Sequence, residues 1–235
     1  MKTTHIIVEF DPYSKNYKKL VNQSVNFSGL TVDFFTRGKA NFLNSFLENK
    51  QDCKILDIGC GTGEIHSFLE KNQRQITGVD VSTESLKIAQ GKYPANQYLL
   101  YDGYTLPFDD NTFDVALTIC VMHHVTPSQW QHFIDEMVRV VKPEGWVFIF
   151  EHNPYNPLTR LAVNRCPFDK DAVLLRSKKA ENLLNTTNLI RCKGDFIFFT
   201  PFKHSVFQKL DKLLSWLPLG AQYCTYGKKR NSNVV

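Results

Sequence analysis

The sequence predicts an α/β protein: a Rossmann-like, doubly wound sheet of about seven strands, mostly parallel with an antiparallel last strand, and with helices on both faces. A short apolar stretch at residues 54–58 runs into a glycine-rich turn and then a helical pattern. Strand-like and helical stretches alternate from there along the middle of the chain, which is typical of parallel βαβ units. Residues 113–121 form the continuous apolar run that a parallel strand buried on both faces requires.

The element boundaries follow from hydrophobic periodicity and from the residues that end helices. The strands expected in the parallel part are 54–58, 75–80, 96–101, 113–121 and 146–151. The helices expected between and after them are 64–71, 82–90, 128–141 and 177–185. Lys142 to Gly145 is predicted to form a type I turn, with proline second and glycine fourth. Residues 196–200 and 222–227 are expected to pair as antiparallel strands.

Length and composition predict one globular domain, or one domain with a cap. A chain of 235 residues is long enough to bury a sizeable core. Its hydrophobic fraction of 43% and charged fraction of 22% are ordinary for a soluble protein. The formal net charge of +5 is explained by a solvated surface and does not demand an anionic partner. Nucleic-acid binding is not predicted, because basic residues do not alternate with aromatic ones along one stripe.

Cysteine usage and hydropathy favour an intracellular protein. The six cysteines are scattered without a C-x-x-C pair, which favours reduced thiols. Residues 1–10 lack the apolar core of a signal peptide, and no apolar run reaches membrane-spanning length. We therefore expect a soluble, cytoplasmic protein, whose oligomeric state the sequence does not fix.

The turn Gly59-Cys60-Gly61-Thr62-Gly63 follows the first expected strand. Such a turn directs several backbone N–H groups and a helix N-terminus at one spot, which suits a carboxylate or a phosphate. Dinucleotide-binding folds use similar turns. Here the glycines are spaced G-x-G-x-G, and Asp57 precedes the first of them by two positions. In these two details the segment resembles motif I of the class I S-adenosylmethionine-dependent methyltransferases.

The resemblance covers roughly Lys54 to Phe150, and Leu106-Pro107-Phe108 resembles the small-molecule, type 11-like branch of the family. It implies S-adenosylmethionine as the cofactor. Asp80 would accept hydrogen bonds from both ribose hydroxyls; the alternative is an exposed aspartate that caps the next helix. Asp102 would accept one from the adenine amino group; the alternative is a loop aspartate that satisfies its own turn. The implied cofactor-binding residues are Asp57, Gly59, Cys60, Gly61, Gly63, Asp80, Val81, Asp102, Gly103, Cys120 and Tyr17.

Residues 1–50 are expected to form a helical lid or cap, and residues 51–235 the methyltransferase domain. Apolar positions between residues 34 and 47 recur at helical spacing, so a helix there is expected to pack on the sheet. The F-D-x-x-x-x-x-Y spacing that ends at Tyr17 resembles the family's lid tyrosine, which approaches the methionine end of the cofactor. The alternative is that Tyr17 packs its ring on a helix.

An irregular insertion is expected at about residues 152–176, after the fifth strand. Irregular segments at the carboxyl ends of strands are where such folds build substrate pockets. The predicted acceptor-binding residues of this segment are Tyr155, Asn156 and Phe168, which predict a pocket with apolar walls.

Three histidines fall on the same rim of the predicted sheet and are the candidate general bases. In order of preference they are His152, His124 and His123. The string V-M-H-H-V resembles the L-H-H segment of many small-molecule and quinone methyltransferases. A structural role is the alternative for each histidine. No metal is assigned, because the sequence offers no obvious third ligand.

Residues 203–217 predict an amphipathic helix with a leucine-rich face. One interpretation is a helix that covers the sheet. The other is an interfacial helix that touches a bilayer, with Trp216 and the lysines at the boundary.

The function predicted by this resemblance is methyl transfer from S-adenosylmethionine to an oxygen atom of a small-molecule or lipid-linked acceptor. C-methylation of a quinone-type precursor is the alternative within the class. A nicotinamide-dependent oxidoreductase or a non-catalytic cofactor-binding partner protein would use the same glycine turn. The oxidoreductase leaves Asp102 unexplained and prefers the spacing G-x-G-x-x-G.

Overall fold

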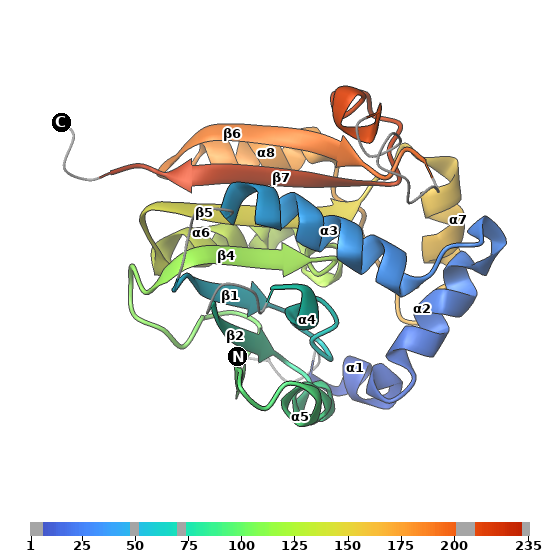
Figure 1. The fold of residues 1–235 in the computed structure, drawn as a ribbon, viewed down its shortest axis with the longest axis horizontal. Coiled ribbons are helices and arrows are strands. Elements are labelled where there is room, and N and C mark those ends of the chain that lie inside the picture. Colours follow the sequence, from blue (N-terminus) through green and yellow to red (C-terminus); the bar gives the residue numbers. More distant parts are fainter. Residues whose placement is uncertain (1–6, 48–51, 70–73, 201–209, 232–235) are drawn as a thin grey trace.

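The computed structural model describes residues 7–47, 52–69, 74–200 and 210–231. Its centre is a seven-stranded sheet in the order β3-β2-β1-β4-β5-β7-β6 (Figure 1). The strands are β1 Lys54–Ile58, β2 Gln75–Asp80, β3 Gln97–Leu100, β4 Phe113–Ile119, β5 Val141–His152, β6 Leu189–Ile197 and β7 Gln222–Lys229. β1 to β5 pair in parallel, and β7 pairs antiparallel with both β5 and β6. The predicted fold class is confirmed.

Strand order reverses between β1 and β4, which lie side by side although β2 and β3 separate them in the chain. This is the topological switch point at which open parallel sheets bind ligands. The carboxyl ends of both strands therefore mark the edge where a site is expected.

Side chains alternate between two hydrophobic cores, one on each face of the sheet. On β5, Val147 and Ile149 join one core, while Phe148 and Phe150 join the other. The first core is closed by α6 (Trp130–Val140) and α8 (Ser177–Asn185), and the second by α3 (Val32–Leu47) and α4 (His66–Leu69). Figure 1 shows α3 and α4 in front of the sheet and α6 and α8 behind it.

The remaining helices are α1 Ile7–Ser14, α2 Tyr17–Val25, α5 Thr83–Lys92 and α7 Pro157–Arg165. Of these, α1, α2 and α7 gather beyond the carboxyl ends of the parallel strands (Figure 1). Gly29, with φ of 70°, caps the short turn of 3₁₀-helix that follows α2 and lets the chain reverse into α3. The helix expected at residues 34–47 is confirmed, and it packs on the sheet.

Several elements differ from the prediction, and two differ by more than a few residues. The segment expected to be irregular contains α7, which Asn156 caps by accepting hydrogen bonds from the backbone N–H groups of Leu158 and Thr159. An asparagine followed by proline at the first helical position is a helix start signal, although the segment lacks a regular hydrophobic period. The strand expected at residues 196–200 begins earlier, at Leu189, and ends at Ile197.

The turn before the fifth strand was also predicted with the wrong geometry. Glu144 has φ of 66°, whereas the third residue of a type I turn has a negative φ. The segment belongs to β5, and a Cβ atom on Gly145 would lie 2.7 Å from the carbonyl oxygen of Asp114. Close approach of two backbones, rather than a free-standing turn, therefore explains this glycine.

The amphipathic stretch predicted at residues 203–217 lies partly outside the described residues. Within them, residues 210–213 are helical and the helix ends there. Leu213 is 72% exposed and Trp216 is 71% exposed, so these two side chains do not cover the sheet. Across the parts of the chain that the structure describes, no helix combines the length and the apolar character that crossing a membrane needs.

Candidate active site

A cavity of about 460 Å³ lies at the carboxyl ends of β1, β2, β4 and β5 and beneath the N-terminal helices. Most of the residues predicted for the site line it. They are Tyr17, Asp57, Gly59, Cys60, Gly61, Asp80, Val81, Gly103, Cys120, His123, His124, His152, Asn156 and Phe168. Gly63, Asp102 and Tyr155 are not among the lining residues.

The glycine turn forms the floor of this cavity. The backbone N–H groups of Gly59 and Cys60 donate to the carbonyl oxygen of Val79, at 2.8 and 3.0 Å, which ties the turn to β2. Gly59 and Gly61 have φ of 71° and 52°, a region that favours glycine. A Cβ atom on Gly59 would lie 2.4 Å from the side chain of Val121, whereas one on Gly61 would meet nothing within 4 Å. The first glycine is therefore needed for packing, and the second leaves open space beside the cavity.

Asp80 lies at the end of β2 and joins two parts of the floor. Its carboxylate accepts hydrogen bonds from the backbone N–H of Gly61, at 2.7 Å, and of Ser82, at 2.8 Å. It is buried, and burial raises its pKa to about 6. Ser82, not Asp80, caps α5. The alternative of an exposed helix-capping aspartate is therefore wrong.

A buried histidine that the sequence analysis missed supports the first strand. His66 lies with its Nε2 atom 3.0 Å from Asp57 Oδ2 and its Nδ1 atom 2.7 Å from the hydroxyl of Tyr98. An ionised carboxylate only accepts hydrogen bonds, so Nε2 donates to Asp57 and Nδ1 faces the tyrosine hydroxyl. His66 and Asp57 are 0% and 2% exposed. The signal that could have identified His66 is its position seven residues after Gly59, the first glycine of motif I, at the start of α4.

Asp102 satisfies its own turn. Its Oδ1 atom accepts hydrogen bonds from the backbone N–H groups of Tyr104 and Thr105, both at 2.8 Å. The side chain is exposed and does not line the cavity. Gly103 beside it does line the cavity, with φ of 78°.

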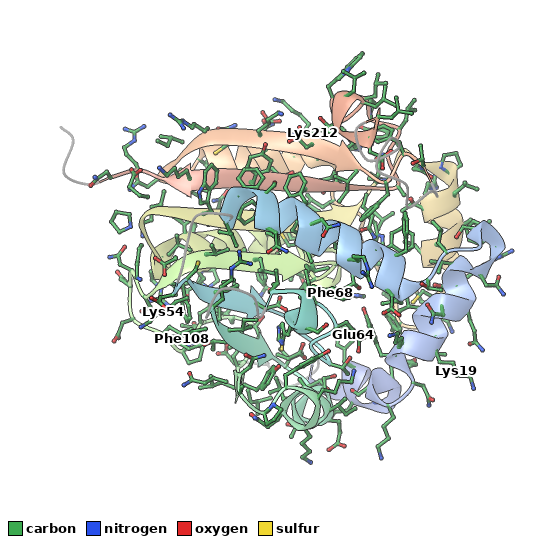
Figure 2. The ribbon with its side chains drawn as sticks, in the orientation of Figure 1. Lys19, Lys54, Glu64, Phe68, Phe108 and Lys212 are labelled. Atoms are coloured by element: carbon green, nitrogen blue, oxygen red, sulfur yellow. The ribbon has the colours of Figure 1, made fainter. Side chains whose placement is uncertain are left out.

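Helices α1 and α2 lie over the cavity and contact both of its ends. On the glycine-turn side, Lys18 Nζ is 3.8 Å from Glu64, which Figure 2 labels between α4 and these helices. On the other side, the ring of Tyr17 stacks on Phe168 with centroids 5.5 Å apart. Tyr13 also packs against Phe168, at 5.7 Å.

The three predicted histidines meet at the other end of the cavity, around two carboxylates. His123 Nδ1 is 2.7 Å from Glu151 Oε2, and its Nε2 is 3.5 Å from Asp169 Oδ1. His124 Nε2 is 3.3 Å from the same Asp169 oxygen. The ring of His152 lies 5.1 Å from that of His123. Glu151 and Asp169 were not predicted. Glu151 directly precedes His152 in the chain, but it pairs with His123, 28 residues away, and no spacing rule links Asp169 to the histidines.

These contacts give the three histidines different proton affinities. Burial lowers the pKa of His123, but Glu151 and Asp169 more than offset this and hold it well above its ordinary value. For His152, burial and the neighbouring His123 cation lower the pKa to about 4. Burial also lowers the pKa of His124. His123 is therefore the protonated partner of the two carboxylates, and the other two rings are neutral near pH 7.

Two further residues that the sequence analysis missed line the wall between the glycine turn and the histidines. Lys39, on α3, is 6% exposed, and its Nζ atom lies 3.8 Å from Cys120 Sγ. Gln222, on β7, has its Nε2 atom 3.3 Å from His152 Nδ1. Cys120 itself has φ of 55°, a strained conformation for a residue with a side chain.

Two of the three predicted acceptor-binding residues line the cavity, and the third does not. Phe168 lies in the wall of the cavity against Tyr13 of α1 and Tyr17 of α2, and Asn156 reaches the cavity from the start of α7. Tyr155 lies elsewhere: it is 56% exposed and has the guanidinium of Arg176 over its ring, at 5.7 Å. The N-cap turn of α7 directs its side chain outward, which the sequence could not indicate without that helix.

The floor of the cavity fits the cofactor that the sequence implies. Two glycines with positive φ leave the backbone open, and the adjacent buried carboxylate of Asp80 is an acceptor for hydroxyl groups. Residues 56–149 match the family described as "Methyltransferase domain".

Known relatives agree with this match. An uncharacterized methyltransferase of Synechocystis is 33% identical over 104 residues, which cover 44% of this chain and about half, 49%, of that protein. A ubiquinone/menaquinone biosynthesis C-methyltransferase of Campylobacter jejuni is 26% identical over 224 residues, covering 89% of this chain and 92% of that one. A crystal structure of a SAM-dependent methyltransferase from Archaeoglobus fulgidus superimposes with a TM-score of 0.69 at 15% identity, over 91% of this chain and all of that one. At that identity the likeness shows the fold alone.

The chain therefore contains a class I S-adenosylmethionine-dependent methyltransferase domain, as the motif I resemblance implied. The nicotinamide oxidoreductase alternative does not agree with this family match.

Proposed function

We propose that the protein transfers the methyl group of S-adenosylmethionine to an oxygen atom of a small-molecule or lipid-linked acceptor. The observation that carries this proposal is that the glycine turn with Asp80 and the histidine–carboxylate cluster open into one cavity. One end has the groups that suit the cofactor, and the other has the groups that can take a proton from an acceptor.

The first group of residues would hold the cofactor. Bound S-adenosylmethionine supplies a methyl group already activated on a sulfonium, so the protein's main contribution is alignment and exclusion of water. The open space beside Gly61 would receive the amino-acid end, and Asp80 would accept the ribose hydroxyls. Lys39 would add a buried positive charge for a carboxylate, of the cofactor or of the acceptor.

The second group would handle the proton of the acceptor hydroxyl. His123 is occupied by Glu151 and Asp169 and is already protonated, so it does not suit the role of general base. His152 and His124 are the neutral imidazoles of the cavity. Either could accept a proton once an acceptor lies within hydrogen-bond reach.

The N-terminal helices would act as the lid over both groups, consistent with a helical cap within residues 1–50. Their contacts are polar near the glycine turn and aromatic at the acceptor end, as with Lys18 and Tyr17. Such a cover excludes water when closed and can open for exchange. Apolar lining residues such as Val21, Leu158 and Phe198 would suit an acceptor with a hydrocarbon part.

C-methylation of a quinone-type precursor is the second candidate. The similarity to the Campylobacter enzyme, which extends over nearly the whole chain, favours it. An acidic ring carbon would need the same general base as a hydroxyl does.

The test is methyl transfer from S-adenosylmethionine, labelled in its methyl group, to pools of phenols, hydroxylated isoprenoid lipids and demethylated quinones. The site of the new methyl group is then determined by NMR. An O-methyl product supports the first candidate, and a C-methyl product supports the second. Absence of product from every pool while S-adenosylhomocysteine still binds would support a non-catalytic cofactor-binding protein.

The same assay at saturating cofactor tests the base. Turnover is expected to fall at least about 100-fold in His152→Ala or His124→Ala, because general-base catalysis contributes roughly 10²–10⁴-fold. His132→Ala is the matched control, since His132 stacks on Tyr104 outside the cavity. Unimpaired turnover in both cavity variants would exclude a histidine base.

A further inference from the structure

We propose that His123, His152 and Asp169 bind a divalent first-row transition-metal ion, such as Zn²⁺ or Fe²⁺, at the acceptor end of the cavity. Each of the three residues offers one ligand atom, and these atoms all lie within 4.8 Å of one another. Two imidazole nitrogens and a carboxylate oxygen are the donor set of many catalytic zinc and non-haem iron sites.

The spacing is close to what such an ion needs. With metal–ligand distances of about 2.1 Å, ligand atoms in a tetrahedral site lie about 3.4 Å apart. His123 Nε2 and Asp169 Oδ1 are already 3.5 Å apart. The other ligand atoms lie within 4.8 Å of one another, so His152 has to approach by no more than about 1.4 Å, which a side-chain rotation supplies.

Glu151 holds the His123 ring in the orientation that a metal ligand requires. It lies 2.7 Å from Nδ1, on the opposite side of the ring from Asp169. A carboxylate that accepts the Nδ1–H leaves the Nε2 lone pair for the ion, and this carboxylate–histidine–metal arrangement is the usual support of histidine ligands. The cluster therefore has an outer carboxylate as well as a candidate ligand carboxylate.

Two buried oxygens in the cluster are without hydrogen-bond partners among the described residues, Asp169 Oδ1 and Gln222 Oε1. Asp169 is 7% exposed, so solvent water does not supply the missing hydrogen bond to this oxygen. Its nearest polar atoms are His124 Nε2 at 3.3 Å and His123 Nε2 at 3.5 Å, which are long contacts for a buried carboxylate oxygen. A cation between them satisfies it.

Gln222 fits the same explanation. Its amide nitrogen lies 3.3 Å from His152 Nδ1. The two ends of a glutamine amide are assigned from their surroundings, and with the amide reversed the oxygen would accept from Nδ1–H. This would direct the His152 Nε2 lone pair to the ion and give the unpartnered oxygen a donor.

Charge is also balanced by a divalent ion. Glu151 and Asp169 are both buried and close to His123. In the metal-free protein the proton on His123 offsets part of this negative charge. An ion that displaces the Nε2 proton to solvent neutralises both carboxylates. Mg²⁺ and Ca²⁺ are not favoured, because they prefer all-oxygen ligands.

Three protein ligands leave coordination positions open to the cavity. Resting on the proposed function, we assign these positions to an oxygen donor of the acceptor, such as a hydroxyl group beside a carbonyl or a second hydroxyl. A coordinated hydroxyl loses its proton more readily, and His124, at 3.3 Å from Asp169, is the histidine left to receive it.

The test is a Co²⁺ titration of the chelator-treated protein, followed by visible d–d absorption and by calorimetry, and a competition with Zn²⁺. We expect one ion per chain. Asp169→Asn and His152→Gln should weaken Co²⁺ binding at least tenfold, and His132→Gln should leave it unchanged. Absence of binding, or equal affinity in Asp169→Asn and the parent protein, would overturn the site.

A second measurement separates this inference from the proposed function. S-Adenosylhomocysteine is titrated into the same variants, whose folding is checked by circular dichroism. Unchanged cofactor affinity with lost Co²⁺ binding supports a separate metal site. Loss of Co²⁺ binding that occurs only in unfolded variants would count against it, with His152→Gln serving as the milder of the two changes. Methyl transfer that persists in fully chelated protein would overturn the metal's role toward the acceptor but not the methyltransferase activity.

Discussion

The two ends of the cavity are built differently. At the cofactor end, the turn from Gly59 to Gly63 and the carboxylate of Asp80 belong to two neighbouring parallel strands, and backbone N–H groups make most of the contacts. At the acceptor end, Lys39, His123 and Asp169 come from a helix, a short turn after β4 and the loop after α7. There the contacts are between side chains.

We infer from this difference that substitutions at one end can leave the other end unchanged. Backbone contacts depend on φ and on close approach, so the cofactor end tolerates few substitutions but needs few particular side chains. The acceptor end depends on the charge and shape of individual side chains carried on loops that a fixed sheet positions. We therefore expect cofactor-end variants to alter stability and cofactor affinity together, and acceptor-end variants to alter acceptor binding or turnover without changing cofactor affinity.

The largest effect is expected from His66→Ala. It leaves the buried Asp57 carboxylate without its nitrogen partner, and the free energy of unfolding should fall by about 3 kcal/mol or more. Urea denaturation measures this. The double variant Asp57→Asn with His66→Ala should lose less than the sum of the single variants, because it buries no unpaired charge. Strict additivity would show that the pair does not stabilise the cofactor end.

The next effect is expected from Gly59→Ala. The added methyl group meets Val121 at 2.4 Å, and φ of 71° disfavours any residue with a side chain. We expect S-adenosylhomocysteine affinity, measured by calorimetry, to fall about 100-fold, or roughly 3 kcal/mol. Gly91→Ala is the control, because it lies in α5 with nothing within 4 Å of the new atom. Equal affinity in both variants would contradict a rigid glycine floor.

Cofactor affinity should also depend on pH through Asp80. Its pKa is raised to about 6, so the carboxylate is charged above that value and protonated below it. If the charged form accepts the ribose hydroxyls, the dissociation constant for S-adenosylhomocysteine should rise as pH falls below 6, by up to about tenfold per unit. Asp80→Asn should bind weakly at every pH tested. A parent protein whose affinity is flat between pH 5 and 7 would remove Asp80 from the ribose site.

Phe168→Ala tests the other end. Removing the ring that Tyr17 and Tyr13 contact should raise the Michaelis constant for the acceptor about tenfold, through loss of roughly 1–2 kcal/mol of apolar contact. Cofactor affinity should stay within a factor of two of the parent value. If the Michaelis constant for the acceptor and the dissociation constant for the cofactor change equally, the two ends are not independent.

The smallest effect is expected from Asp102→Ala. Because its carboxylate is exposed and bound to its own turn, we expect a loss of about 1 kcal/mol in stability. Cofactor affinity should fall by no more than about fivefold, since the turn still carries Gly103 beside the cavity. A loss of 100-fold would instead support the adenine contact that the motif implies.

Local sequence patterns were sufficient to predict the fold and most of the cofactor end. Hydrophobic periodicity located β1, β2 and α8 at their observed bounds, and the G-x-G-x-G spacing located the turn that forms the cavity floor. These features are local: a strand, its turn and the next helix are consecutive in the chain, so spacing alone describes them. His66 on α4 is the exception, because its partner Tyr98 lies on β3, which does not follow that helix directly in the chain.

The acceptor end is assembled only when the chain folds. Glu151, Asp169 and Gln222 meet His123 and His152 through pairing of β5 with β7 and through the loop after α7. Apart from the neighbours Glu151 and His152, these residues lie far apart in the chain, and no period or motif relates them. Burial then sets the charges of these groups, and burial is a property of the packed molecule rather than of the order of its residues.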